Sequence, residues 1–224
     1  MFEAIIFDFD GVILESEPIH FAAIHQVLKE QGIELSKEEY WNTYLGLPDE
    51  QIFTQLFSNQ EKAKRLTLQK NRLYHQAIKE AQTLPVIKGF HRFLHEITQK
   101  INKIGLYSCA VRSEINVCLE KLSLDPMPFE IIITAEDVKK RKPYSDGYLL
   151  AAQKLEIAPT KCVVIEDSPT GIAAAKAAGM HVIALATTFK KDALLQADEI
   201  FNDFEDLLQK NHLNVWRGRS NLLF

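Results

Sequence analysis

Short runs of consecutive apolar residues recur along the chain, and helical spacing of apolar residues separates them. Runs without polar alternation are typical of parallel strands that are covered on both faces. Helical patterns follow most of these runs, so the sequence predicts an α/β fold with a doubly wound, Rossmann-like parallel sheet. The predicted strands are residues 4–7, 103–108, 131–134, 162–165 and 181–185, with a short edge strand at 199–201.

The stretch between the first two predicted strands carries only helical signals. Proline, glycine and capping residues predict three helices in succession, and apolar spacing predicts a long amphipathic fourth helix. We therefore expect an α/β catalytic core formed by residues 1–15 and 85–224, with an all-helical cap domain, residues 16–84, inserted in it. The helix signals are Pro18, Gly32, Ser36, Gly46, Pro48 and the apolar series from Ala63 to Ala81.

Composition restricts the class of protein. The chain has 224 residues, of which 46% are hydrophobic and 25% charged, as expected for a globular protein. A net charge of −4 offers no general basic surface for nucleic acid, and no apolar run approaches the length of a membrane span. Three cysteines form no paired framework, which favours a reducing compartment, so we expect a cytoplasmic protein. Residues 216–224 receive no assignment.

Two aspartates stand at the end of the first predicted strand. Asp8 and Asp10 are two residues apart, so their side chains are expected on the same side of an extended chain. Like charges held that close repel each other unless a cation or a shared proton lies between them. Solvated acids that close a strand would account for one aspartate, but not for the pair followed by Gly11. The pair therefore indicates a functional site.

Polar residues also follow three other predicted strands. Ser108 ends the second strand, Asp137 lies just past the third, and Glu166 and Asp167 close the fourth. Ligands of open parallel sheets bind outside the carboxyl ends of the strands. We therefore expect these residues to converge with the paired aspartates in one crevice.

The acids in this set are suited to a hard metal ion. Asp8, Asp10 and Asp167 offer carboxylate oxygens, which fit Mg²⁺ better than zinc or copper. Glu166 could bind the ion directly or orient a bound water. The metal would offset the repulsion between the carboxylates and a phosphate group.

The remaining polar residues fit phosphoryl transfer. One carboxylate of the aspartate pair can attack phosphorus to form an aspartyl phosphate, and the other can carry the proton of the leaving group. Lys142 would place a fixed positive charge on the phosphoryl group, and the Ser108 hydroxyl would donate a hydrogen bond to it. Each also has an ordinary alternative, a solvated loop for Lys142 and a turn for Ser108. His20, on the first cap helix, is a candidate substrate contact, although the helix surface is its ordinary setting.

Together these segments resemble the haloacid dehalogenase-like superfamily, in the subgroup with a helical cap inserted after the first motif. Residues 7–12 are similar to its first motif and residues 106–108 to its second. Lys142-Pro143 is similar to the third, and residues 164–175 match the fourth almost letter for letter.

The resemblance implies a role for each candidate. Asp8 would be the nucleophile and Asp10 the acid/base, with Ser108 and Lys142 in contact with the phosphate. Mg²⁺ would be held by Asp8, the Asp10 carbonyl and Asp167. Dehalogenases of this superfamily lack the second acid, so Asp10 favours phosphoryl transfer.

The nearest alternative is a sugar phosphomutase similar to β-phosphoglucomutase. Such enzymes hold a second phosphate with basic residues in the first cap hairpin, whereas residues 44–50 here include no lysine or arginine. An acidic hairpin would repel a second phosphate. We therefore expect a magnesium-dependent phosphatase for a small phosphorylated metabolite, a monomer or weak dimer without nucleic-acid or membrane partners. A third interpretation is a non-catalytic phospholigand-binding module. Such a module is expected to have lost one of the motif acids, and this sequence retains them.

Overall fold

The computed structural model describes residues 2–101, 103–122, 124 and 128–210. These residues divide into two compact units: one holds the chain up to Glu15 and from Leu84 onward, and the other is Ser16–Thr83. Residues 216–224, which have no assignment from the sequence, lie outside the described residues.

A six-stranded sheet forms the centre of the first unit. Its order is β3-β2-β1-β4-β5-β6, and every neighbouring pair is parallel. All predicted strands are present, and the short one at 199–201 lies at the sheet edge as expected. The strands are β1 (Ala4–Phe7), β2 (Lys103–Tyr107), β3 (Ile131–Ile133), β4 (Cys162–Glu166), β5 (His181–Leu185) and β6 (Glu199–Phe201).

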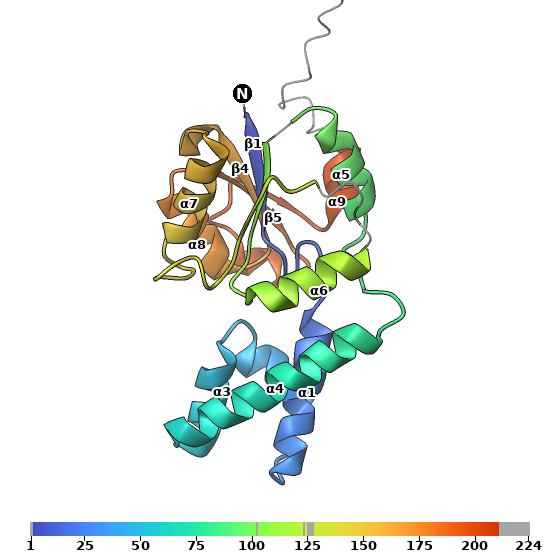
Figure 1. Ribbon diagram of the computed structural model, residues 1–224, viewed down its shortest axis with the longest axis vertical. Coiled ribbons are helices and arrows are strands. Elements are labelled where there is room, and N and C mark those ends of the chain that lie inside the picture. Colours follow the sequence, from blue (N-terminus) through green and yellow to red (C-terminus); the bar gives the residue numbers. More distant parts are fainter. Residues whose placement is uncertain (1, 102, 123, 125–127, 211–224) are drawn as a thin grey trace, which may run out of the picture. The chain divides into compact units, whose positions relative to one another are not determined.

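Helices cover both faces of this sheet (Figure 1). One face carries α7 (Asp146–Leu155) and α8 (Pro169–Ala177), and the other carries α5 (Phe90–Thr98) and α9 (Phe204–Gln209). The predicted doubly wound α/β fold is therefore confirmed. The unit also contains α6 (Arg112–Leu122) and two short 3₁₀ turns, η2 (Pro159–Lys161) and η3 (Lys191–Ala193).

Strand β1 shows why the apolar runs are continuous. Ile6 belongs to the core cluster that holds Tyr148 of α7 and Ile172 of α8, whereas Phe7 packs on the opposite face against Phe90 and Phe204. Both faces are buried, so each position in the strand must be apolar. Burial of one such side chain contributes about 1.5–3 kcal/mol. These contacts fix the strand end from which Asp8 follows.

A loop distant in the sequence caps the start of α6, which begins at Arg112. The backbone nitrogen of Arg112 donates a hydrogen bond of 2.8 Å to the Glu136 carboxylate, which comes from the loop after β3. The Asp137 carboxylate accepts hydrogen bonds from the Arg112 guanidinium and from the backbone and hydroxyl of Thr134. A distant loop therefore supplies the cap, and Asp137 braces that loop.

The second unit is helical throughout its described residues, as predicted. The Ser36 hydroxyl accepts a hydrogen bond from the Glu39 backbone, so the predicted capping residue is in place. The predicted second helix is, however, a single α turn followed by a π turn. No described helix of the chain has the length and hydropathy needed to cross a membrane. The elements are α1 (Glu17–Glu30), α2 (Lys37–Glu39), η1 (Tyr40–Tyr44), α3 (Asp49–Phe57) and α4 (Gln60–Glu80).

Candidate active site

Three adjacent strand ends bring polar side chains together in the α/β unit. Asp8 follows β1, Ser108 follows β2, and Glu166 and Asp167 stand at the end of β4. Strand β1 pairs with β2 on one side and with β4 on the other, so these ends are neighbours. All four side chains are buried, a setting in which charged groups need partners.

The turn after Asp8 fits closely against Asp167. Gly11 has a φ of +73°, and a Cβ atom at this position would overlap with the Asp167 carboxylate. The Thr187 hydroxyl donates a hydrogen bond of 2.5 Å to the Gly11 carbonyl. Burial is the largest cause that raises the pKa of Asp8, and the Asp10 charge adds a smaller effect in the same direction.

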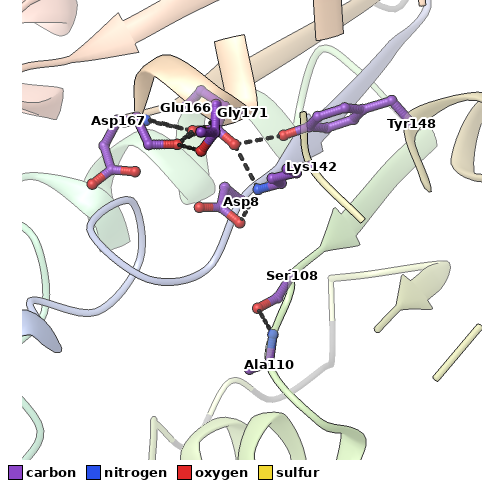
Figure 2. Close-up of polar contacts among 10 residues, drawn as sticks. Asp8, Ser108, Ala110, Lys142, Tyr148, Glu166, Asp167 and Gly171 are labelled. Carbon is purple, nitrogen blue, oxygen red and sulfur yellow. Dashed lines mark hydrogen bonds and ion pairs between the residues drawn. The ribbon is translucent and has the colours of Figure 1, made fainter. Parts of the chain in front are cut away.

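Lys142 lies between two of the buried acids. Its Nζ atom is 2.5 Å from Asp8 Oδ1 and 2.5 Å from Glu166 Oε1 (Figure 2). The side chain is only 6% exposed, so the ammonium group is not solvated in a loop. The peptide bond between Lys142 and Pro143 is cis.

Glu166 has hydrogen-bond donors on both carboxylate oxygens. Oε1 accepts from Lys142 and from the Tyr148 hydroxyl, the latter at 2.9 Å. Oε2 accepts from the backbone nitrogens of Asp167 and Ser168 and from the Ser168 hydroxyl. A metal bound directly by Glu166 would have to displace some of these donors. The contacts therefore favour Glu166 as the anchor of Lys142.

The buried charges change the protonation of the site. Burial, opposed by Lys142 and reinforced by Glu166, raises the pKa of Asp8 to about 8. Burial and the charges of Glu166 and Asp8 also raise the pKa of Asp167 well above its ordinary value. Burial alone would raise the pKa of Glu166, but the Lys142 ammonium and the hydrogen bonds outweigh it and hold that pKa below its ordinary value. Asp8 and Asp167 are therefore the two acids whose negative charge is not fully offset by the neighbouring positive charge.

The same acids could hold a metal ion. One carboxylate oxygen from each of Asp8, Glu166 and Asp167 lies within 4.8 Å of the others. Oxygen-only donor sets of this kind suit a hard divalent cation. Because Glu166 is engaged elsewhere, Asp8 and Asp167 are the side chains best placed to bind one.

Ser108 is positioned by the loop that follows it. Its Oγ atom accepts a hydrogen bond of 3.0 Å from the Ala110 backbone nitrogen. A hydroxyl that accepts in this way keeps its own hydrogen for donation. The side chain is buried at the end of β2, next to the strand that carries Asp8.

His20 lies half-buried in the helical unit, where it contacts the buried residues Lys70 and Tyr74. Its Nδ1 atom is 2.7 Å from the Lys70 ammonium, and its ring stacks on Tyr74 with a centroid distance of 4.2 Å. An ammonium group can only donate, so Nδ1 accepts and the proton of the neutral ring is assigned to Nε2. Lys70 also forms an ion pair with Asp49 at 2.8 Å.

The Lys70 contact bears on the acidic hairpin of the cap. The negative charge of Asp49, within residues 44–50, is offset by Lys70. Lys70 comes from α4, outside that hairpin. Lys70 is 2% exposed, and a buried lysine in an amphipathic helix has no local sequence signal.

Other residues of the site were also missed from the sequence. The sequence does not predict that the hydroxyls of Tyr148 and Ser168 bind Glu166. Gly171 lies in the first turn of α8, where a Cβ atom would overlap with the Glu166 carboxylate. A glycine inside a helix was the one available signal, because alanine is normally preferred there.

Comparison with known proteins identifies the family. A profile of the haloacid dehalogenase-like hydrolases matches residues 5–185. The chain belongs to this family. It is 29% identical over 223 residues to a phosphorylated carbohydrates phosphatase from Thermotoga maritima, covering 92% of this chain and 100% of that protein.

Two further proteins are similar to this chain over most of its length. The haloacid dehalogenase-like chain is 29% identical over 215 residues to β-phosphoglucomutase from Bacillus subtilis, covering 92% of this chain and 91% of that protein. A solved haloacid dehalogenase-like protein of unknown function from Agrobacterium tumefaciens has a TM-score of 0.80 and 27% identity, covering 96% of this chain and 100% of that chain. The family resemblance stated from the sequence motifs is thus confirmed.

Gly171 provides a test of the Glu166 anchor in this haloacid dehalogenase-like hydrolase. Helix propensity alone predicts that Gly171→Ala stabilises the protein by up to about 1 kcal/mol. The contact with Glu166 predicts a loss of about 1–3 kcal/mol in the free energy of unfolding, because the carboxylate must shift and disturb Lys142. Urea unfolding of both proteins at neutral pH measures the difference. A variant as stable as the wild type would contradict the proposed fit.

Proposed function

We propose that this protein is a magnesium-dependent phosphatase that hydrolyses a small phosphorylated carbohydrate through an aspartyl-phosphate intermediate. The observation that carries the proposal is the Lys142 ammonium shared between Asp8 and Glu166 at the carboxyl end of the sheet. It holds a buried carboxylate nucleophile next to a fixed positive charge, as attack on an anionic phosphate requires. The phosphatase from Thermotoga maritima supports the choice of substrate class.

The residues divide the reaction between them. A carboxylate oxygen of Asp8 attacks phosphorus, and the bond from phosphorus to the leaving oxygen breaks. Asp10 donates a proton to that oxygen and later takes a proton from the water that attacks the aspartyl phosphate. Lys142 offsets the charge of the phosphoryl oxygens, and the Ser108 hydroxyl donates a hydrogen bond to one of them.

Magnesium fits the donor set of the site. The raised pKa values of Asp8 and Asp167 are those of buried acids that need a cation to ionise together. Asp8, Asp167 and the Asp10 carbonyl would hold the ion, and Glu166 would act through Lys142. Bound Mg²⁺ would offset the negative charge that the carboxylates and the phosphate share.

We propose that the helical unit is the cap and selects the substrate. His20 would contact the part of the substrate away from the phosphate. Lys70 is already paired with Asp49, so this cluster has no surplus positive charge for a second phosphate. The pairing therefore favours a substrate with one phosphate, and hydrolysis over a phosphomutase reaction.

The cysteines and the net charge support a proposal for the cellular compartment and the class of partner. Cys109 and Cys162 are free thiols, which supports a reducing compartment such as the cytoplasm. The net charge of −4 supports a small-molecule substrate over nucleic acid. We propose a monomer or weak dimer that acts without a membrane partner.

Mutase activity is the second candidate, because the chain is as similar to β-phosphoglucomutase as to the carbohydrate phosphatase. Incubation with a sugar 1-phosphate, followed by phosphorus NMR, separates the two. Free phosphate is the product of a phosphatase, and a sugar 6-phosphate is the product of a mutase.

Two aspartate substitutions test the assigned roles. Asp8→Asn should abolish phosphate release from a panel of phosphorylated carbohydrates, because no carboxylate remains to attack. Asp10→Asn should reduce the rate about 10²–10⁴-fold, as the loss of a general acid/base does. Asp192→Asn changes an exposed aspartate in η3 and should leave the rate unchanged. Appreciable activity of Asp8→Asn would exclude Asp8 as the nucleophile.

Metal removal tests the magnesium site. Treatment with a chelator should abolish phosphate release, because Asp8 and Asp167 would then lack their shared cation. Added Mg²⁺ should restore the original rate, as followed by phosphate release before and after dialysis. Activity that persists in the chelator would count against the metal site.

A further inference from the structure

A tyrosine hydroxyl shares the oxygen that anchors Lys142. Tyr148, on α7, donates to Glu166 Oε1 at 2.9 Å, and the Lys142 ammonium contacts the same oxygen at 2.5 Å (Figure 2). The Tyr148 side chain is fully buried, and its ring centroid lies 5.4 Å from the ammonium. One buried oxygen therefore interacts with both a neutral donor and a cation.

This sharing limits how strongly Glu166 attracts the lysine. Lys142 also contacts Asp8 at 2.5 Å, on the side where the phosphoryl group binds in the proposed reaction. A hydrogen bond from Tyr148 stabilises the negative charge on Oε1 and fixes the carboxylate plane. Without it, Oε1 would depend on Lys142 alone and would draw the ammonium away from Asp8.

Tyr107, on β2, offers a matched comparison. Its ring packs edge-to-face on Tyr148 with a centroid distance of 4.9 Å, and it is equally buried. Gly147 permits this packing, because a Cβ atom there would overlap with the Tyr107 ring. The Tyr107 hydroxyl lies near Cys109 and the Lys142 backbone, but it makes no hydrogen bond of regular geometry within the described part of the chain. The two tyrosines share their surroundings and differ in one hydrogen bond.

We propose that Tyr148 is a positioning residue for Lys142. Its hydroxyl holds Glu166 Oε1 so that the ammonium remains beside Asp8 and available to the phosphoryl group. This role rests on the phosphatase function proposed above, and Tyr148 itself does not touch the substrate.

The test compares Tyr148→Phe with Tyr107→Phe in the full chain with Mg²⁺. Tyr148→Phe should lower kcat about 10- to 100-fold, the range expected when a hydrogen bond to a charged group is lost. The affinity for inorganic phosphate, measured by calorimetry, should fall in the same direction. Tyr107→Phe should stay within about twofold of the wild type in both measurements, because its hydroxyl makes no hydrogen bond of regular geometry and none to Glu166.

Several outcomes would overturn the role of Tyr148. Equal losses in the two variants would assign the effect to the loss of a buried hydroxyl in general, and not to the hydrogen bond between Tyr148 and Glu166. Wild-type kcat in Tyr148→Phe, an unchanged phosphate affinity, or a variant that no longer unfolds cooperatively would each exclude positioning through Lys142.

The phosphate measurement also separates this inference from the proposed function. If the wild type binds phosphate but hydrolyses no substrate, the phosphatase assignment fails, and a weaker phosphate affinity in Tyr148→Phe alone still supports the positioning role. If the wild type neither binds phosphate nor hydrolyses a substrate, both are overturned.

Discussion

The Lys142 ammonium allows acids from two neighbouring strands to share one buried site. Asp8 follows β1 and Glu166 ends β4, and each lies 2.5 Å from Lys142 Nζ. Removing one partner from a buried ion pair costs about 3–5 kcal/mol, because the remaining charge is left without compensation. The lysine is in turn held by Glu166, whose other donors come from the backbone after β4 and from Tyr148. The site is therefore one connected network.

The sheet gives this network its rigidity, and close packing gives it its shape. Ile6 and Phe7 are buried on opposite faces of β1, so the position of Asp8 is fixed by both layers of helices. Gly11 and Gly171 lie where a side chain would overlap with Asp167 and Glu166. The helical unit contains its own buried lysine, and there too the charge is matched by a carboxylate. In both units, a buried cation organises the polar residues around it.

Much of this organisation could be predicted from local sequence. Continuous apolar runs located the strands, and the polar residues that follow them located Asp8, Ser108, Glu166 and Asp167. What could not be predicted depends on partners distant in the sequence. The Glu136 cap of α6, the Asp49–Lys70 pair and the Tyr148 hydroxyl on Glu166 each join segments that no local pattern connects. The role of Glu166 likewise could not be predicted, because it depends on the hydrogen-bond donors that surround the carboxylate in the folded protein.

The central claim is that Asp8 forms a covalent bond to phosphorus. The most direct measurement is mass spectrometry of protein quenched with acid during turnover of a phosphorylated carbohydrate. A nucleophilic Asp8 should yield one added phosphoryl group on the peptide that contains it, sensitive to hydroxylamine as an acyl phosphate is. Steady turnover with the phosphoryl group on another residue would contradict it.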